Sequence, residues 1–307
     1  MAEKKEPTRK QHYIPQEHLR GFSQDAITIY EYNIKKSAAI KTPVPIESVC
    51  REKDLYELYD SQGQIVNVNY LEDILCTYEG RYAEFRRQLL KKAKLKDNYR
   101  TKCFLTKEEK QFWYFYTALQ VVRIPSILQG TAEILQEAYP GHLTENAAAN
   151  LAREYCLPFF TPPEKEDENS LLAFLYLLAP KSISVCYTPS DRLFTSDAAV
   201  YGYSPKDVLF DFETLWFPIC SCVSLLFSDP KTQEQSLNNR LIPMDEKTVD
   251  DLNKGIACIA HNMVFSKHPF TEKDIEIIQD ARRLEAERTH KYEIIKKLGD
   301  SIGEPNE

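Results

Sequence analysis

Glycine is scarce in this sequence: the 307-residue chain has 9 glycines, against 18 tyrosines and 15 phenylalanines. Phosphate-binding loops need glycine where the backbone approaches a phosphate, and neither GxGxxG nor GxxxxGK[ST] occurs. The motifs HExxH, GxSxG, CxxC and an EF-hand loop are missing as well. These absences exclude the common nucleotide-binding loops and the hydrolase families that are recognised by these motifs.

Long apolar runs are also missing. No run reaches the roughly 20 residues that cross a bilayer, and the longest, around residues 171–179, predicts a core helix. The first ten residues lack the apolar core of a signal peptide. We therefore expect a cytoplasmic protein without a membrane partner, in which the 8 cysteines are reduced and buried.

Cysteines that could share one site are rare, because only Cys220 and Cys222 lie close together. Side chains separated by one residue in a strand point to opposite faces, so these two cannot bind one metal unless the strand bends. No cysteine has a sequence context that predicts a lowered pKa. The sequence therefore does not favour a Cys–His hydrolase.

The charge balance is acidic, with a net charge of -7, which argues against a general nucleic-acid coat but leaves room for a local basic groove. One basic segment runs through residues 86–102, with Asp97 as its only acid. Two interpretations stay open: a solvated helix end, or a phosphate-binding surface. In the second, Lys91, Lys92 and Lys94 bind the substrate.

The hydrophobic pattern predicts an α+β protein. Asn69 with Glu72, and Thr106 with Glu109, have the spacing of capping boxes that begin long helices. Short β-type runs dominate residues 183–227, and a long amphipathic helix is expected over residues 271–298. We expect a helical N-terminal half with a small β cap, packed on an antiparallel sheet from the C-terminal half. Residues 1–307 then form one domain, although a linker at 161–168 allows a subdivision into 11–160 and 170–297.

The stretch His12-Tyr13-Ile14-Pro15-Gln16-Glu17-His18-Leu19-Arg20-Gly21-Phe22 concentrates polar groups beside a proline. Pro15 suits the first turn of a helix, and Gly21 suits a helix end with positive φ. Gln16 and Arg20 would share one face, with His12 just before the first turn.

Several segments together resemble a known family. The stretch from His12 to Phe22 is one, and the others are Gln120-Val121-Val122-Arg123-Ile124-Pro125, Phe194-Thr195-Ser196-Asp197, Trp216-Phe217-Pro218 and Asn262-Met263-Val264-Phe265-Ser266. In this order they resemble the family called domain of unknown function 4238. The resemblance implies one fold unit and candidate residues, but no activity.

Arg123 is the polar residue with the most demanding environment. It projects with Gln120 from a helix face that also carries Tyr116 and Trp113. A buried guanidinium needs an anion, so we expect it to be buried and paired with Glu79 or Asp197. Asp197 follows Ser196 at a strand end, which is typical both of a cleft residue and of an ordinary turn.

Two functional hypotheses follow from this dispersed polar set. In the first, the protein is a hydrolase of a phosphate-containing substrate, specifically a nuclease, and His12, Arg20, Arg123 and Asp197 meet in space. The catalytic residues are then His12, Gln16, Arg20, Gln120, Arg123 and Asp197, with Ser196 binding substrate and with Glu79 and Asp197 holding Mg²⁺ or Mn²⁺. In the second, the protein is a non-catalytic interaction domain and the cluster only fixes the fold. A cluster sealed from solvent favours the second hypothesis.

Overall fold

A strand near the start of the chain pairs with the last strand that the structure describes. The computed structural model of the protein describes residues 6, 8–94, 103–157, 178–203, 213–229 and 238–302, with side chains to residue 287. Within these, β2 (Thr28–Asn33) runs antiparallel to β14 (Met263–Ser266), and β14 pairs in turn with β9 (Thr195–Ser196). Strands β3 (Ala38–Ala39) and β4 (Val44–Pro45) extend the other side of β2. The expected N-terminal β cap is therefore not a separate unit, because it shares a sheet with the C-terminal part.

A second sheet lies in the C-terminal half and has the strand order β10-β11-β12-β8-β13. Its strands are β8 (Ser182–Tyr187), β10 (Tyr201–Tyr203), β11 (Thr214–Cys220), β12 (Val223–Ser228) and β13 (Leu241–Pro243). All pairs are antiparallel except β13 with β8. Every residue of β12 is buried, so both faces of this central strand are covered.

Two short ladders and a 3-10 turn complete the β structure near the N-terminus. Strand β1 (Lys10–His12) pairs with β5 (Arg51–Lys53), and β6 (Leu58–Tyr59) forms a hairpin with β7 (Ile65–Val66). The 3-10 helix η1 covers Ile46–Ser48. Asp54, between β5 and β6, adopts a left-handed turn conformation with φ of 53°.

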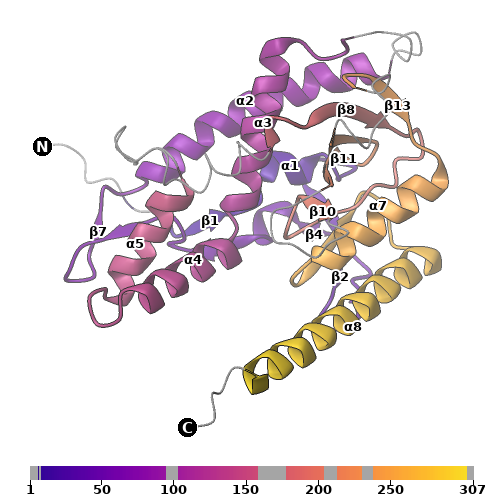
Figure 1. The fold of residues 1–307 in the computed structure, drawn as a ribbon. Coiled ribbons are helices and arrows are strands. Elements are labelled where there is room, and N and C mark those ends of the chain that lie inside the picture. Colours follow the sequence, from indigo (N-terminus) through magenta and orange to yellow (C-terminus); the bar gives the residue numbers. More distant parts are fainter. Residues whose placement is uncertain are drawn as a thin grey trace, which may run out of the picture.

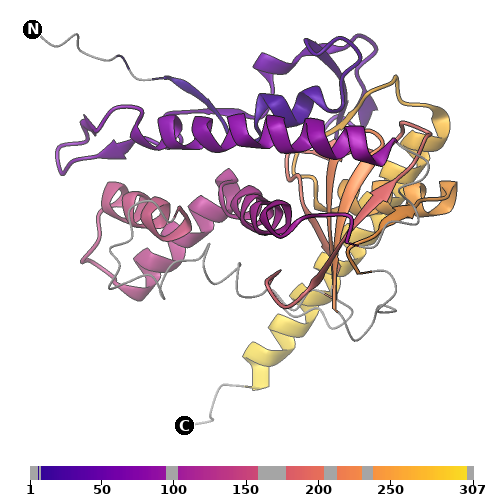
Figure 2. The same ribbon diagram turned by 90° about the horizontal axis from the view of Figure 1, so that it is seen from above.

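Seven helices are present in the described residues: α1 (Gln16–Arg20), α2 (Tyr70–Ala93), α3 (Lys107–Val122), α4 (Pro125–Ala138), α5 (Glu145–Cys156), α7 (Glu246–Ile259) and α8 (Glu272–Ile302). Figure 1 shows α7 and α8 beside the sheets, and Figure 2 shows α2 spanning the molecule from α5 to the sheets. The α+β class is confirmed. The predicted linker at 161–168, the helix at 171–179 and the basic residues 95–102 lie outside the described residues.

The two predicted capping boxes have different outcomes. The Thr106 side chain accepts from the Glu109 N–H, and the Glu109 carboxylate accepts from the Thr106 N–H, so this box is confirmed. The Asn69 box is wrong, because Asn69 is left-handed (φ 59°, ψ 16°) and its side chain accepts from the Thr8 N–H instead. Glu72 is left with a buried, unpartnered Oε2, and burial raises the pKa of its carboxyl to about 7.

One hydrophobic core joins both halves of the chain, with members such as Phe22, Trp113, Phe217 and Phe265. None of the described helices is long and apolar enough to cross a membrane.

Gly21 has a role different from the one its sequence position predicts. It does not end α1 with a positive φ, since its φ is -64°. A Cβ at this position would instead lie 2.7 Å from the Ile219 carbonyl oxygen on β11 and 2.8 Å from Nη1 of Arg86 on α2. Gly21 is therefore required for the close approach of three elements.

We expect Gly21→Ala to lower the free energy of unfolding by about 1–3 kcal/mol, because a backbone carbonyl must shift to admit the methyl group. Gly80→Ala is the matched control: it lies inside α2 with nothing within 4 Å of its added Cβ. That change should be neutral or stabilising by about 0.5–1 kcal/mol. Urea unfolding of the two variants checks this, and equal effects would contradict the crowding at Gly21.

Candidate functional site

Arg123 lies at the end of α3 and is 1% exposed. Its Nη1 donates to Glu79 Oε1 at 2.9 Å, and its Nη2 donates to the His12 carbonyl oxygen at 2.9 Å. Its Nε donates to the Tyr56 hydroxyl at 3.2 Å. The expectation that Arg123 is buried and paired with Glu79 is confirmed, and the guanidinium joins α2, α3 and the end of β1.

The polar side chains expected around Arg123 are buried to different degrees. Gln120 is 1% exposed, and neither atom of its amide has a hydrogen-bond partner in the described residues. His12 is half-buried, and its Nε2 is buried and unpartnered. Burial lowers the pKa of His12, against a backbone hydrogen bond to Glu47 that raises it. Arg123 and Gln120 are therefore closed off from solvent, whereas His12 and Glu79 are only partly covered.

Asp197 does not pair with His12 or Arg123 through any hydrogen bond or ion pair in the described chain. Its two carboxylate oxygens accept from the backbone N–H groups of His261 at 2.8 Å and Asn262 at 2.7 Å. Burial raises the pKa of Asp197, and these backbone donors oppose the rise. Ser196 makes a local bond to the Ala198 carbonyl oxygen at 2.8 Å. Both side chains therefore stabilise turns, here between α7 and β14 and after β9.

The carboxylates expected to hold a divalent metal are engaged elsewhere. Glu79 bonds to Arg123, and Asp197 bonds to two backbone amides. Across the described residues, no group of three or more His, Cys, Asp or Glu side chains is placed to hold a metal ion.

His18 is a central residue that the sequence analysis did not single out. Its Nδ1 lies 3.1 Å from the Tyr82 hydroxyl on α2, and its Nε2 lies 2.9 Å from the Thr195 hydroxyl on β9. The ring stacks on Phe217 of β11, with centroids 5.3–5.4 Å from those of Phe22 and Phe217. Burial lowers the pKa of His18 to about 3, so the imidazole is neutral. Its neighbours in the sequence, Glu17 and Leu19, give no sign of these long-range bonds.

A cleft of about 360 Å³ opens where α1, α2 and the β11–β12 turn meet. It is lined by Arg20, Gly21, Arg86, Leu90, Lys94, Tyr187, Pro189, Asp191, Cys220, Ser221, Cys222 and Lys267. Four of these are cations and one is a carboxylate, so we name it the cationic cleft. Of the residues predicted from sequence, it contains Arg20 and Lys94; Gln16 lies beside it and bonds Arg20 at 3.2 Å.

The cations of the cleft are held by specific partners. Arg86 Nη1 donates to the Glu17 carbonyl oxygen at 2.8 Å, and its Nη2 pairs with the Glu17 carboxylate. Lys267 pairs with Asp191, which also accepts from the Ser221 hydroxyl. Arg20 and Lys94 are more exposed, and Arg20 pairs with Glu17 at 3.3 Å. The cleft therefore combines half-buried cations held by partners with cations that are more open to solvent.

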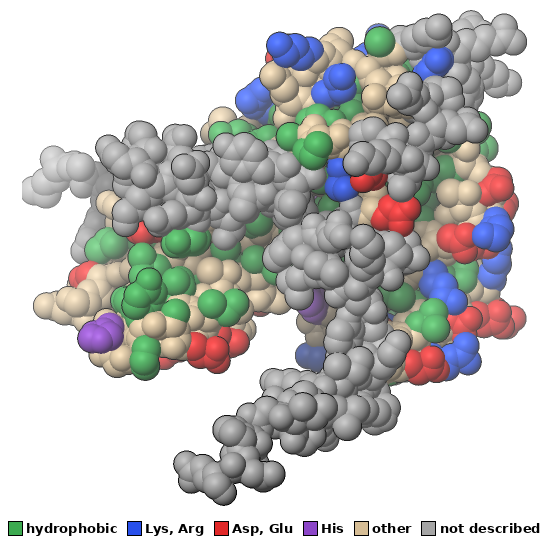
Figure 3. Space-filling model, viewed as in Figure 1, with side chains coloured by type: hydrophobic (Ala, Val, Ile, Leu, Met, Phe, Trp, Pro, Cys, Tyr) green, Lys and Arg blue, Asp and Glu red, His purple; other side chains and the backbone are tan. Residues whose placement is uncertain are grey.

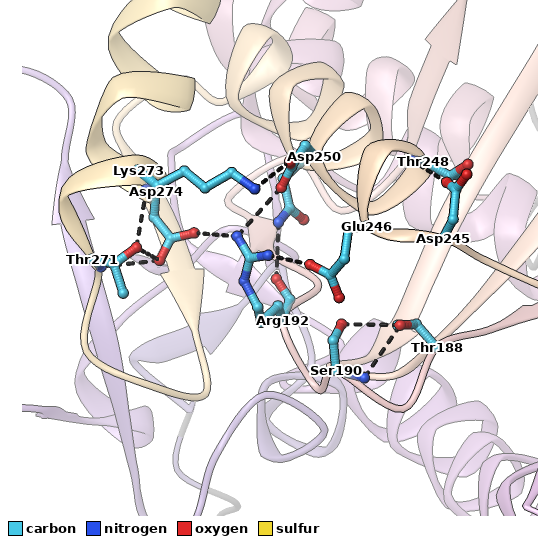
Figure 4. A network of polar contacts seen from close by, with 11 residues as sticks. Thr188, Ser190, Arg192, Asp245, Glu246, Thr248, Asp250, Thr271, Lys273 and Asp274 are labelled. Atoms are coloured by element: carbon cyan, nitrogen blue, oxygen red, sulfur yellow. Dashed lines mark hydrogen bonds and ion pairs between the residues drawn. The ribbon is translucent and has the colours of Figure 1, made fainter.

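The loop that carries Asp191 is anchored from behind by Arg192. Figure 4 shows the Arg192 guanidinium between acidic side chains of two helices: it donates to Glu246 at 2.6 Å and Asp250 at 3.3 Å on α7, and to Asp274 at 3.0 Å on α8. The Arg192 carbonyl oxygen accepts from Asn253 at 2.9 Å. This network fixes the loop after β8, and with it the acidic edge of the cleft.

Cys220 and Cys222 lie close together because the strand ends between them, which is the bend that the sequence analysis required. Strand β11 ends at Cys220, Cys220 pairs with Val223 of β12, and Ser221 and Cys222 form the turn between the two strands. The two sulfur atoms are 3.5 Å apart. All 8 cysteines have free thiols, although Cys76 and Cys103 are exposed rather than buried as expected.

The predicted lysines of the basic segment are divided among different environments. Lys92 pairs with both carboxylate oxygens of Glu109, at 2.6 and 2.8 Å, and so joins α2 to α3. Lys91 is exposed, and Lys94 lines the cationic cleft. Figure 3 shows Lys and Arg gathered where the end of α2 approaches the start of α3, whereas acidic and basic side chains alternate over α7.

A second cleft, of about 430 Å³, lies against α4 and α5. Its charged lining consists of Glu52, Glu133, Glu145 and Arg153, so carboxylates predominate. It includes none of the residues predicted from sequence, and its charge does not suit an anionic substrate.

Comparison with known proteins gives a family match. A family model described as Protein of unknown function (DUF4238) matches residues 10–269. The comparisons with curated proteins and with solved structures found no match.

The neutral state of His18 predicts a pH dependence of stability. An unfolded histidine has a pKa of about 6.5, so the lowered pKa contributes stability that is complete above this value and is lost as the pH falls toward 3. Between about pH 7 and pH 5 the loss is about 2 kcal/mol. Urea unfolding at both pH values should show a smaller loss in His18→Gln, whereas the exposed His142→Gln should behave as the unaltered protein does. Equal losses in all three would exclude His18 as the responsible group.

We expect Arg123→Met to lower the free energy of unfolding by about 3–5 kcal/mol, because it leaves the Glu79 carboxylate without its cation. Glu79→Gln should cost less, since Arg123 keeps its bonds to His12 and Tyr56. The double variant should be more stable than the sum of the two changes predicts. Chemical denaturation of the four proteins measures this coupling, and strict additivity would show that the pair is not coupled.

Proposed function

Because the chain belongs to the family described as Protein of unknown function (DUF4238), we propose its function from the geometry of the cationic cleft. The protein is a hydrolase that binds a phosphate-bearing substrate there, and a nuclease is the specific activity that we propose. The observation that carries this proposal is the convergence of Arg20, Arg86, Lys94 and Lys267 on one cleft in a chain of net charge -7.

Several features support a phosphate-bearing ligand in this cleft. The guanidinium of arginine is a planar donor that can bond two phosphate oxygens, and the ammonium of lysine is a compact positive charge that can bond one. The cations outnumber the single lining carboxylate, Asp191, so the local charge is opposite to that of the whole chain. Such a local field attracts anions even to an acidic protein. Nucleic acid is the partner that this proposal implies, and the free thiols fit the expected cytoplasmic location.

The burial of Gln120, Arg123 and Asp197 supports the second of the sequence-based hypotheses for these residues. In this proposal they and His12, whose Nε2 is buried, serve the fold, because none of them lines the cationic cleft. In this proposal, the catalytic role expected of these four residues belongs to residues of the cationic cleft instead. His12→Ala should lower the melting temperature and leave phosphate binding unchanged.

Binding of inorganic phosphate and of a single-stranded oligonucleotide tests the proposal. Lys94→Gln and Lys267→Gln should each weaken binding roughly tenfold, since a bond to a charged group is worth about 1.5–3 kcal/mol. The dependence of oligonucleotide affinity on salt concentration should flatten in both variants. Titration calorimetry at two salt concentrations provides these values.

Lys35→Gln is the matched control for this test, because Lys35 is exposed and does not line the cleft. It should bind phosphate as the unaltered protein does. Hydrolysis is then followed with labelled DNA and RNA, with and without Mn²⁺. If the unaltered protein binds neither phosphate nor oligonucleotide, the proposed function is wrong.

A further inference from the structure

The lining of the cationic cleft includes two thiols, those of Cys220 and Cys222, which are not needed to bind a phosphate. Cys220 ends β11 and Cys222 lies in the two-residue turn to β12; both residues line the cleft, and their sulfur atoms are 3.5 Å from each other. Cys220 is 4% exposed, whereas Cys222 is half-buried. A ligand in the cleft would therefore lie beside this pair of thiols.

The surroundings of Cys220 stabilise a thiolate. The backbone N–H groups of Cys222 and Val223 donate toward its sulfur, as does the Cys222 thiol, and Arg86 supplies positive charge. Burial alone would raise the pKa of Cys220, but these donors together bring it below its ordinary value. The same arrangement raises the pKa of Cys222, mainly because its thiol hydrogen bonds to Cys220. Of the two thiols, Cys220 is therefore the one favoured to lose its proton, and Cys222 the one favoured to keep it.

Charged groups from several elements line the cleft beside this pair. Arg20 comes from α1, Arg86 and Lys94 come from α2, and Lys267 follows β14. Asp191 is the one acid in the lining; it is neutralised by Lys267 and bonded to Ser221. Arg86, one of the cations that would bind phosphate oxygens, also lowers the pKa of Cys220.

We propose that the Cys220 thiolate attacks the phosphorus of a phosphate ester bound in the cationic cleft, while the Cys222 thiol protonates the leaving oxygen. The S–P bond forms as the P–O bond to the leaving group breaks, and the alcohol departs with the proton of Cys222. Water then attacks the phosphorus, the S–P bond breaks, and one proton of the water returns to Cys222. The net reaction consumes one ester and one water, and needs no oxidant or reductant. This inference rests on the proposed function and names its nucleophile.

The reactivity of the thiols tests the proposal without knowledge of the natural substrate. Iodoacetamide at about pH 6, followed by peptide mass mapping, should alkylate Cys220 roughly tenfold faster than the exposed Cys76, despite the greater access to Cys76. Inorganic phosphate should protect Cys220 and leave Cys76 unaffected. If Cys76 reacts faster than Cys220, or if bound phosphate gives no protection, the proposal is overturned.

The covalent step is tested with two esters, 4-nitrophenyl phosphate and bis(4-nitrophenyl) phosphate, which stand for phosphate monoesters and diesters. Acid quenching followed by mass spectrometry should find a phosphoryl group on Cys220 with at least one of them, and the ester that reacts identifies the substrate class. Cys220→Ser should lose the adduct, whereas Cys76→Ser, the matched control, should keep it. Cys222→Ala should slow turnover of alkyl esters, which need a proton donor, more than turnover of nitrophenyl esters.

The outcomes separate this inference from the proposed function. Phosphate binding without an adduct from either ester overturns the covalent step and leaves the cleft as a binding site. The absence of phosphate binding overturns both. An adduct on another residue assigns the nucleophile elsewhere and overturns the role of Cys220.

Discussion

A neutral imidazole joins the distant parts of this fold. His18 uses both ring nitrogens, one toward Tyr82 on α2 and one toward Thr195 on β9, and its face stacks on Phe217 of β11. Such a site tolerates neither a charge nor a missing nitrogen, because an unsatisfied polar group would then remain buried. The orientation of α1 depends on these bonds, and so does the position of Arg20 and Gly21 at the edge of the cationic cleft.

Two arginines illustrate how buried charge can serve different purposes in one protein. Arg123 is sealed beneath aromatic side chains and is neutralised by Glu79, so its bonds hold α2, α3 and β1 together. Arg86 also bonds a carboxylate and a carbonyl, both from Glu17, yet it lies at the wall of a cleft and remains part of a cationic surface. The difference lies in access to solvent, which sequence patterns on two similar helices do not reveal.

The local features of this protein could be predicted from sequence, and the long-range ones could not. The Thr106–Glu109 box and the burial of Arg123 follow from residue spacing and from the cost of an uncompensated charge. Asn69 departs from its predicted cap because Thr8, far away in the chain, takes its side-chain oxygen. The closeness of Cys220 and Cys222 depends on a two-residue turn that begins directly after Cys220, and the turn's position is set by the pairing of β11 with β12.

The pairing of β2 with β14 means that this sheet can form only after nearly the whole chain has been made. Residues 28–33 find their partner only at residues 263–266, so this sheet has a high contact order and its loop-closure entropy is large. During synthesis, β2 is released long before β14 exists, and its edge stays unpaired for that time. An unpaired apolar edge is a site of self-association. We expect a ribosome-bound chain that ends before residue 263 to self-associate through this edge more readily than the finished protein does.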